Sequence, residues 1–545
     1  MNKKWEFYQV NENDVQKIAQ NYDLPELIAK VLADRGITSD EDIEVFLNPT
    51  RNDFHDPFAM PDCEIAVNRI ISAIENNEKT IIYGDYDVDG ITSITVLKKF
   101  LEERGLDVDY YIPNRLDEGY GLNKPAIKEI ADKGYTLMIT VDCGISSIEE
   151  TEYAKSLGLE VIITDHHETL DELPKALAVM DAKRKDSKYP WSMLAGVGVV
   201  FKLIQAISIK LGLEEKEYLK YLDLVCVGTI SDIVPLADEN RVIAKLGLKL
   251  VAMSKNLGLK ALIKSSGYKQ VDSNMVSFGI APRINACGRM GFEQEAAKLF
   301  LTDSITKAEE ITKRLNEYNK ERQETEKAIF EEANKMLEKE DIEKLPSIVL
   351  ASPNWHHGVI GIVASKLTEM YHKPSILLCI EGENAKGSGR SIPGFDLHDA
   401  LCKSSTYLEK YGGHGMAVGL SLKKQNIEAF KEKFGQIAND AHLEELQPII
   451  YIDKQIEAKD LKIETIEQIQ KLEPFGEGNK MPVFLYKNLK IDSIRSLSEG
   501  KHLKLTLKDE GYILQAIGFN MGVLANEYLI GDKVDIVRIL RDKRV

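Results

Sequence analysis

Acidic residues and two histidines recur at four places in the sequence where they could bind metal ions. They are Asp85, Asp87 and Asp89 in GDYDVDG, Asp142 in VDCG, Asp165, His166 and His167 in TDHHE, and Asp232 in SDIVPL. In an extended chain, side chains two residues apart point the same way, so the first three carboxylates would repel one another unless a cation neutralised them. Oxygen ligands suit Mg²⁺ or Mn²⁺ best. The set is large enough for two ions with a bridging carboxylate, and such a pair activates water for attack on a phosphoryl group.

Each motif taken alone has a simpler interpretation. A single acidic motif is as often a solvated turn as a metal site, and a pair of histidines is more often structural than functional. The recurrence of acidic motifs, and the aspartate directly before the two histidines, favour the metal site.

The segments around these motifs alternate between short apolar runs and helical patterns. Apolar runs precede Asp85, Asp142 and Asp165, whereas ITSITVLKKFLEERG and NKPAIKEIADKG carry apolar residues three and four apart and stop at Gly105 and Gly134. Alternating strands and helices predict βαβ units and a parallel sheet. Ligands bind beyond the carboxyl ends of the strands of such sheets, so we expect the acidic motifs to converge there.

Length and composition indicate a multidomain intracellular enzyme. The chain has 545 residues, too many for a single core. Its six cysteines are scattered without a CxxC pair, which argues against structural zinc or a disulfide framework, and we expect them to be reduced and buried. No apolar run reaches about 18 residues, and the polar start MNKKWEFYQVNEND lacks the apolar core of a signal peptide. We therefore expect a cytoplasmic protein without a membrane span.

The order GDYDVDG, VDCG, DHH and SDIVPL resembles the four motifs of the DHH phosphoesterase superfamily. RGITSDEDIEVFLNP and IPNRLDEGYGL are more specific and resemble the RecJ family of bacterial single-strand-specific exonucleases. One position departs from the wider superfamily, in which many members have a histidine where Tyr83 stands. We expect Asp85 to take over that coordination role.

The resemblance implies a role for each site residue. Asp87, Asp142 and Asp85 would hold one metal ion, and Asp89, Asp142, His166 and Asp232 the other. His167 would contact the scissile phosphate, and Asp165 would orient the ligating histidine. The remaining candidates would bind substrate: Arg115, Arg289, Ser388, Arg390, Ser391 and His414.

The same resemblance and the element pattern predict an α/β protein of five consecutive parts. They are a helical lead-in (1–75), a DHH phosphoesterase domain with a parallel sheet (76–290), a long connecting helix (291–345), a DHH-associated α/β substrate-binding domain (346–445) and an OB-fold-like β-barrel (446–545). In the fourth part, KGSGRSIPG and YGGHGMAVG are interpreted as glycine loops that let backbone N–H groups approach an anion. A glycine-rich loop is more often an ordinary turn.

The last part contains short strand-like runs that predict a barrel able to hold a single strand in a basic groove with aromatic side chains. Candidates for contacts with the strand are Lys487, Lys490, Arg495, Lys501, Lys504, Phe484, Tyr486 and Phe519. Any one of these aromatic residues is about equally expected in the barrel core.

The charge balance differs between parts of the chain. The net charge is −17, which is unusual for a protein that binds nucleic acid. Residues 292–344 carry 15 acidic and 10 basic side chains, whereas residues 483–545 carry 8 acidic and 11 basic ones. A basic groove can therefore coexist with acidic outer surfaces.

Taken together, the sequence predicts a 5′-to-3′ exonuclease that degrades single-stranded DNA with two Mn²⁺ or Mg²⁺ ions in repair and recombination. The polarity follows from the resemblance alone. A helicase and a single-strand-binding protein are expected partners. Two alternatives stay open: a phosphodiesterase for dinucleotides or short oligonucleotides, and a non-catalytic replication scaffold.

Overall fold

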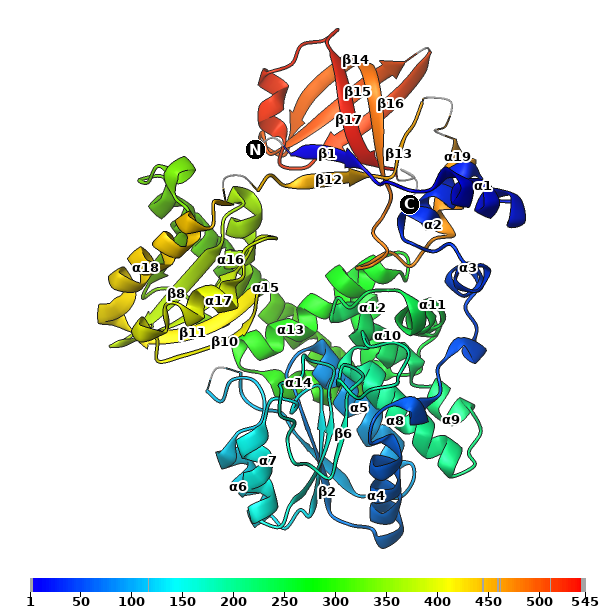
Figure 1. The fold of residues 1–545 in the computed structure, drawn as a ribbon, viewed down its shortest axis with the longest axis vertical. Coiled ribbons are helices and arrows are strands. Elements are labelled where there is room, and N and C mark those ends of the chain that lie inside the picture. The colour runs from blue at the N-terminus through cyan, green and yellow to red at the C-terminus, as the bar shows by residue number, and fades with distance from the viewer. Residues whose placement is uncertain are drawn as a thin grey trace. The chain divides into compact units, whose positions relative to one another are not determined.

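The computed structural model describes residues 3–115, 117–443, 446–457, 460, 462–509 and 511–540 (Figure 1). Contacts divide the chain into two compact units. The larger unit comprises residues 51–235 and 239–448, and the smaller unit comprises the described residues among 2–50, 236–238 and 449–545.

A five-stranded parallel sheet lies in the first half of the larger unit. Its strand order is β3-β2-β4-β5-β6, with bounds Val108–Tyr111, Thr80–Gly84, Leu137–Val141, Glu160–Thr164 and Ala178–Met180. In register, Ile82 pairs with Ile139, which pairs with Ile162. The three central strands are buried on both faces, as expected for a parallel sheet covered by helices on both sides.

Helices cover both faces of this sheet (Figure 1). On one face, α6 (Lys124–Asp132) and α7 (Ile148–Ser156) pack through Ile127 and Ala154. Helices α4 (Cys63–Asn76), α5 (Val88–Glu102) and α8 (Gly196–Lys210) contact β6, β2 and β4 respectively. The chain runs from β2 to β3 on one side and from β4 to β5 on the other side, so the strand order reverses between β2 and β4. A ligand crevice is therefore expected beyond the carboxyl ends of these two strands. Asp85 and Asp142 stand at those two ends.

A group of helices follows the sheet. They are α9 (Lys216–Leu219), α10 (Leu222–Ser231), α11 (Asp238–Ala252), α12 (Leu257–Ser266), the π-helix Met275–Ile280, α13 (Ala281–Met290), α14 (Glu293–Leu301) and α15 (Ile305–Leu337). Within the expected connecting part (291–345), the structure has the short helix α14 and then the long helix α15 in place of a single helix. The Ser304 side chain accepts a hydrogen bond from the Lys307 N–H and so caps the first turn of α15.

The larger unit ends in a second, mixed sheet with strand order β10-β11-β9-β8-β7. The bounds are Lys410–His414, Ala417–Lys423, Asn384–Arg390, Ser375–Glu381 and Ile348–Ser352, and the accompanying helices are α16 (His357–Tyr371), α17 (Leu397–Cys402) and α18 (Ile427–Asp440). The prediction of glycine loops here was wrong, because GSGR lies in β9 and YGGH in β10. A Cβ on Gly387 would lie 2.5 Å from the side chain of Leu378, so this glycine makes room for a side chain of a neighbouring strand.

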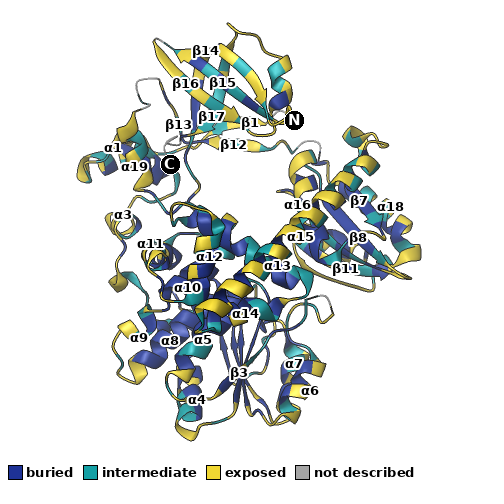
Figure 2. Ribbon diagram, turned by 180° about the vertical axis from the view of Figure 1, so that it is seen from behind, coloured by how far each residue is buried: buried dark blue, intermediate teal, exposed yellow. Residues whose placement is uncertain are grey.

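The smaller unit combines both ends of the chain. Its N-terminal part holds β1 (Lys4–Phe7), α1 (Glu12–Asn21), α2 (Glu26–Asp34) and α3 (Asp40–Leu47), and its C-terminal part holds β12 (Ile449–Ile452), β13 (Lys454–Gln455), α19 (Ile463–Gln470), β14 (Val483–Leu497), β15 (His502–Asp509), β16 (Tyr512–Gly518) and β17 (Lys533–Ile539). The long strand β14 pairs with β13, β15 and β17, which gives the bent sheet of a small barrel. One apolar cluster of buried residues joins the N-terminal helices to the barrel interior. Figure 2 colours the buried parts of these elements dark blue.

Cysteine exposure partly differs from expectation. All six cysteines are free thiols and five are buried, but Cys402 is exposed because it ends α17 at the protein surface.

Within the described ranges, no helix is both long enough and apolar enough to cross a membrane.

Candidate metal centre and substrate pocket

The first acidic motif spans a turn from β2 into α5. Asp85 follows the strand, Asp87 caps α5, and Asp89 lies in its first turn. The Asp87 carboxylate accepts hydrogen bonds from the N–H groups of Asp89 (2.8 Å) and Gly90 (3.1 Å). The expected extended conformation was therefore wrong, since the helix begins at Val88. A Cβ on Gly90 would lie 2.4 Å from the carbonyl oxygen of Asp85, so this tight turn requires glycine.

Helix α8 holds the Asp89 carboxylate from the opposite side. Its first N–H groups, those of Gly196 and Val197, donate to Asp89 Oδ2 at 2.6 Å and to Oδ1 at 2.8 Å. The N-terminus of a helix favours a negative charge, and its otherwise unbonded N–H groups supply donors. Asp89 is thereby fixed as an oriented anion at the centre of the cluster.

Asp142 lies beyond β4 in a left-handed backbone conformation with φ of 58°. Such a conformation is uncommon for a residue with a side chain and is concentrated at functional sites. Its N–H donates to the carbonyl of Thr164 on the neighbouring strand, which holds the turn in place. A Cβ on Gly196 would lie 2.7 Å from Asp142 Oδ1, so only glycine lets α8 start against this carboxylate.

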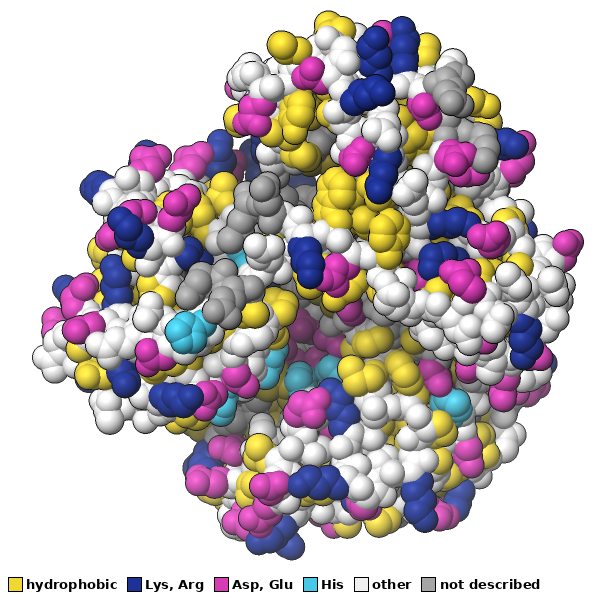
Figure 3. Space-filling view, turned by 45° about the horizontal axis from the view of Figure 1, so that its top comes forward, with side chains coloured by type: hydrophobic (Ala, Val, Ile, Leu, Met, Phe, Trp, Pro, Cys, Tyr) yellow, Lys and Arg dark blue, Asp and Glu magenta, His cyan; other side chains and the backbone are white. Residues whose placement is uncertain are grey.

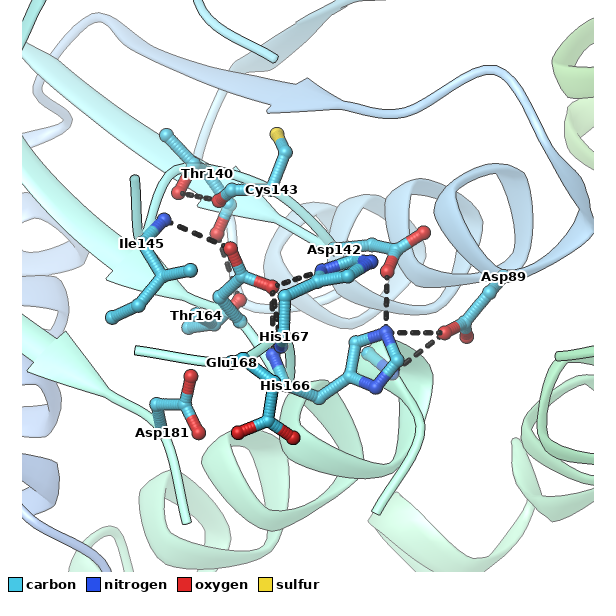
Figure 4. A network of polar contacts seen from close by, with 12 residues as sticks. Asp89, Thr140, Asp142, Cys143, Ile145, Thr164, His166, His167, Glu168 and Asp181 are labelled. Carbon is cyan, nitrogen blue, oxygen red and sulfur yellow. Dashed lines mark hydrogen bonds and ion pairs between the residues drawn. The ribbon is translucent and has the colours of Figure 1, made fainter. Parts of the chain in front are cut away.

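The Asp-His-His segment follows β5 (Figure 4). Asp165 Oδ1 lies 2.7 Å from His167 Nδ1 and also accepts from the backbone N–H of His166, while Oδ2 accepts from Ile145. We expected Asp165 to orient the ring of His166, but the ring that it contacts is that of His167. Burial alone would raise the pKa of Asp165, yet the His167 hydrogen bond and nearby charges lower it to about 2.

The His166 ring reaches three carboxylates. Its Nε2 lies 3.1 Å from Asp142 Oδ1 and 3.8 Å from Asp89 Oδ2, and its Nδ1 lies 3.7 Å from Asp232 Oδ2. Burial lowers the pKa of His166 to about 3, so its imidazole is neutral at physiological pH. A neutral imidazole is the form that ligates metal ions.

Asp232 comes from a helix and not from a strand end. It caps the C-terminus of α10, the apolar stretch LDLVCVGTIS, and α10 packs against α5 and α8. A Cβ on Gly228, one turn earlier, would lie 3.1 Å from Asp89 Oδ1, so glycine again allows a helix to approach the cluster.

The oxygen and nitrogen atoms of these residues form three overlapping groups suited to metal ions. The groups are Asp85–Asp87–Asp142, Asp89–His166–Asp232 and Asp142–Asp165–His166–His167, each within 4.8 Å. Asp142 belongs to two of the groups and so stands between the possible ion positions. All of the predicted metal ligands therefore meet in one place.

The electrostatics of the cluster fit a cation. Burial, with the charge of Asp87, raises the pKa of Asp89 to about 7, and burial also raises the pKa of Asp85, Asp142 and Asp232 well above the usual range of a carboxyl group. Among the described residues, Asp85 Oδ1 and His166 Nε2 are buried and have no hydrogen-bond partner, although Nε2 approaches Asp142 Oδ1 to 3.1 Å. Buried carboxylates that repel one another, together with buried lone pairs directed at the same place, are the donor set of a divalent metal site.

A cluster of arginines lies next to the acidic centre. Arg289 donates to the carbonyl of Gly358 (3.2 Å), and Arg390 donates to Ser388 Oγ (3.1 Å). Burial together with the charges of Arg115 and Arg390 lowers the pKa of Arg289 to about 9, and burial with the charge of Arg115 also lowers that of Arg390. Mutually repelling guanidinium groups in a half-buried position favour an anion, and arginine suits phosphate.

The other two substrate candidates lie near this cluster in different ways. The Ser391 hydroxyl donates to the carbonyl of Phe395 at 2.6 Å, so its proton is already used within the chain. Burial lowers the pKa of His414, and the charges of Arg390 and His167 lower it further, so this imidazole lies within electrostatic range of both residues.

Sequence reasoning missed Tyr120. Its hydroxyl lies 3.1 Å from His167 Nδ1 and donates to the carbonyl of Asp142 at 3.3 Å. The motif GYG was part of the family resemblance, but nothing in the local pattern assigned its tyrosine to the site. The Tyr83 hydroxyl donates to the carbonyl of Gly121 and is not directed at the cluster. Asp85, two residues later, is the side chain that lies with Asp87 and Asp142.

The barrel presents a basic stripe beside an apolar one. Strand pairing aligns Lys490 with Lys508 and Ile513, and Arg495 with Lys504 and Ile517. These side chains point outward because the alternate positions Leu503, Leu505 and Leu507 are buried. Ile513, Ile517 and Phe519 are 64%, 54% and 72% exposed. On the face shown in Figure 3, acidic and basic side chains are interspersed.

Of the two interpretations left open for the barrel aromatics, the structure supports the barrel core for two residues. Phe484 and Tyr486 are 0% and 1% exposed and belong to the barrel core. The first half of β14 has buried side chains at three successive positions, so residue type alone does not separate inward from outward positions there.

Comparison with known proteins places this arrangement in a class. Three family models match the chain: "DHH family, N-terminal domain" over residues 79–229, "DHHA1 domain" over 345–440 and "RecJ OB domain" over 452–544. The parallel sheet is thus that of the DHH family.

The chain belongs to the RecJ family. It is 39% identical over 540 residues to the single-stranded-DNA-specific exonuclease RecJ of Bacillus subtilis, covering 98% of this chain and 68% of that protein. The crystal structure of Thermus thermophilus RecJ in complex with Mn²⁺ superposes with a TM-score of 0.85 at 29% identity, covering 99% of this chain and 76% of that one. The Mg²⁺ complex of the same protein gives 0.79 at 28% identity, with 99% and 75% coverage.

Proposed function

We propose that this chain is a metal-dependent exonuclease that removes nucleotides from the 5′ end of single-stranded DNA. Its relatives in the RecJ family carry the name single-stranded-DNA-specific exonuclease. The observation that supports a 5′ end is the half-buried arginine cluster beside the acidic centre, since it provides a site for a terminal phosphate next to the site of hydrolysis. The direction of digestion itself is taken from the resemblance to the RecJ family.

The two metal positions follow the overlapping groups of ligands. We assign Asp85, Asp87 and Asp142 to one ion, and Asp89, His166 and Asp232 to the other. Asp142 is assigned to the second ion as well, because its Oδ1 lies 3.1 Å from Nε2 of His166. Mn²⁺ or Mg²⁺ bound there would activate water and neutralise charge on the phosphoryl oxygens. The protein's own contribution is to hold these side chains in place, which α8 does for Asp89 and the left-handed turn does for Asp142.

We assign His167 to the scissile phosphate. Burial alone would lower its pKa, but the hydrogen bond and charge of Asp165 outweigh burial and raise that pKa above the usual value. The protonated ring can donate a charge-assisted hydrogen bond to a phosphoryl oxygen. Asp165 orients the ring through Nδ1, and the Tyr120 hydroxyl lies against it.

The arginine cluster is assigned to the 5′-terminal phosphate. Arg115, Arg289 and Arg390 supply the positive charge, with Ser388 beside Arg390. Ser391 and His414 complete the proposed pocket. The charge of Arg115 acts on Asp85 as well as on Arg289, so the pocket and the metal centre adjoin.

The barrel is assigned to the rest of the strand. Its outward lysines and arginine can follow a phosphate backbone, and the adjacent Phe519 offers a ring on which a base can stack.

The five domain ranges expected from the sequence are retained as a proposal. Free thiols throughout support a cytoplasmic location, and a helicase and a single-strand-binding protein are proposed as partners.

A polarity assay tests the proposal. Two long single strands are compared, one with an internal fluorophore near its 5′ end and one with an internal fluorophore near its 3′ end. Each is digested with Mn²⁺, and the labelled products are sized over time. Early release of short labelled products from the 5′ side is expected. Digestion from the 3′ end, or internal cuts, would contradict the assignment of the arginine cluster.

A further inference from the structure

One short loop touches both the proposed phosphate pocket and the metal centre. It connects β3 to α6, and the structure describes it from Ile112 to Asn123 except for residue 116. Arg115 on this loop lies with its guanidinium 4.8 Å from the ring centroid of Tyr86 and adds its charge to the arginine cluster. Tyr120, five residues later, lies against His167 and the Asp142 carbonyl.

Glu118 connects the two ends of this loop. Its Oε1 accepts hydrogen bonds from the hydroxyl of Tyr111, the last residue of β3, at 2.8 Å, and from Nδ2 of Asn123, the N-cap of α6, at 2.9 Å. Its Oε2 accepts from the N–H of Asn114 at 2.6 Å. The Glu118 N–H in turn donates to the Asn114 carbonyl. One carboxylate thus holds the strand end, the loop start and the helix start together.

The partners of Glu118 are themselves fixed. Tyr111 stacks on Tyr83 with ring centroids 5.2 Å apart, and Tyr83 is buried in the sheet. The Tyr83 hydroxyl accepts from Asn123 Nδ2 (3.2 Å) and donates to the Gly121 carbonyl. Asn123 also accepts from the Ala126 N–H as the cap of α6. The loop is therefore tied to rigid elements by Glu118 and, independently of it, by the Tyr83 hydroxyl and by Asn114, whose Nδ2 donates to Glu293 Oε1 at 3.2 Å.

We infer that Glu118 is a positioning residue that sets Arg115 and Tyr120 at the same time, so that recognition of the 5′ phosphate and orientation of His167 depend on one carboxylate. This inference rests on the proposed function of the arginine cluster. Among the described residues, the Glu118 side chain hydrogen-bonds to Tyr111, Asn114 and Asn123, which belong to neither the arginine cluster nor the acidic centre. Its effect would be transmitted by the loop.

The test compares Glu118→Ala and Glu118→Gln with the control Glu149→Gln. Glu149 is an exposed glutamate whose ion pair with Lys124 joins α7 to α6 close to the same region, so its substitution removes a similar charge without touching the loop. Each variant is assayed for kcat and KM on single strands with a 5′ phosphate or a 5′ hydroxyl. Hydrogen exchange of the loop amides and Mn²⁺ binding without DNA are measured in parallel.

For Glu118→Ala we expect the preference for 5′-phosphorylated strands and kcat each to fall by about tenfold, a loss of the size that follows removal of a charged hydrogen-bond partner. Exchange of the loop amides should rise, Mn²⁺ affinity should be unchanged, and Glu118→Gln, which keeps the shape and one acceptor, should fall between. Glu149→Gln should behave as wild type.

The inference is overturned if folded Glu118→Ala keeps both its kcat and its phosphate preference within twofold, or if its losses are matched by weaker Mn²⁺ binding. If Glu118→Ala does not fold, the same criteria apply to Glu118→Gln. A wild-type enzyme without any preference for a 5′ phosphate would instead contradict the proposed pocket. In that case the positioning role is decided by kcat and loop exchange alone.

Discussion

Gly196 donates its N–H to Asp89 at 2.6 Å from the first turn of α8, although the two residues lie 107 positions apart in the chain. The same glycine leaves space for the Asp142 carboxylate, whose Oδ1 would lie 2.7 Å from an added Cβ. The start of α8 therefore fixes both carboxylates that we place at the centre of catalysis.

Gly196→Ala should lower kcat by roughly 100-fold or more, because the added methyl displaces Asp142 and a small misplacement of a catalytic group costs that much. Gly198→Ala is the matched control on the same helix, since its Cβ would meet only the flexible Leu194 side chain, at 3.3 Å. Steady-state kinetics and Mn²⁺ titration of both variants check this. Equal activity of the two variants would show that the space beside Asp142 is not critical.

Arg390→Ala should raise KM for 5′-phosphorylated strands by about tenfold and affect 5′-hydroxyl strands little, because only the former lose a charge-assisted pair. Arg314→Ala, which removes an arginine paired with Glu295 on α14, serves as the control. Competition between the two kinds of strand gives the ratio of their kcat/KM values directly. An equal rise in KM for both strands would mean that Arg390 does not recognise the terminal phosphate.

Two phenylalanines of the barrel should behave in opposite ways. Phe519→Ala should raise KM for long strands several-fold, as expected for loss of a stacking contact of about 1–3 kcal/mol, without changing the melting temperature. Phe484→Ala should cost about 3–5 kcal/mol of stability, because it leaves a cavity in the barrel core. Thermal melts and KM values for both variants check this. A binding defect without destabilisation in Phe484→Ala would reverse the assignment.

Asp34→Asn should stabilise the protein near neutral pH. Burial raises the pKa of Asp34 from 3.8 to about 6, so the folded state favours the protonated carboxyl and wild-type stability falls as pH rises between those values. The asparagine variant avoids that loss. Its gain should be on the order of 1 kcal/mol above pH 6, after allowance for solvent screening and for the ion pair with Lys30, and should vanish below pH 4. Melting temperatures across this range measure the gain, and a gain independent of pH would contradict its cause.

The sequence was sufficient to predict the parallel sheet and the convergence of the acidic motifs, because apolar strands followed by aspartates define both locally. It did not reveal the contact between α8 and Asp89, since the glycine that permits it carries no local signal. The glycines of β9 were interpreted as loops for a related reason: their role is to accommodate Leu378 and other side chains of neighbouring strands, which only the fold identifies. Tyr120 was missed because its partner His167 is 47 residues away.

The burial of Phe484 and Tyr486 could not be read from the sequence either. Register shifts in β14, between Tyr486 and Leu489 and between Ile491 and Ser493, interrupt the alternation of inward and outward side chains. A two-residue period therefore does not assign the faces of this strand. The outward direction of the Lys490 and Arg495 side chains follows only from their pairing with Lys508 and Lys504 of β15.

The central claim is that the buried carboxylate–histidine cluster holds two divalent ions on which hydrolysis depends. The most direct measurement is the stoichiometry of Mn²⁺ binding, by calorimetry on the full chain after EDTA treatment, for wild type and Asp142→Ala. Asp142 stands in both proposed ligand sets. The account predicts two ions per wild-type chain, with activity restored as they bind, and the loss of tight binding together with hydrolysis in the folded variant. Two tightly bound ions and near wild-type turnover in Asp142→Ala would contradict it.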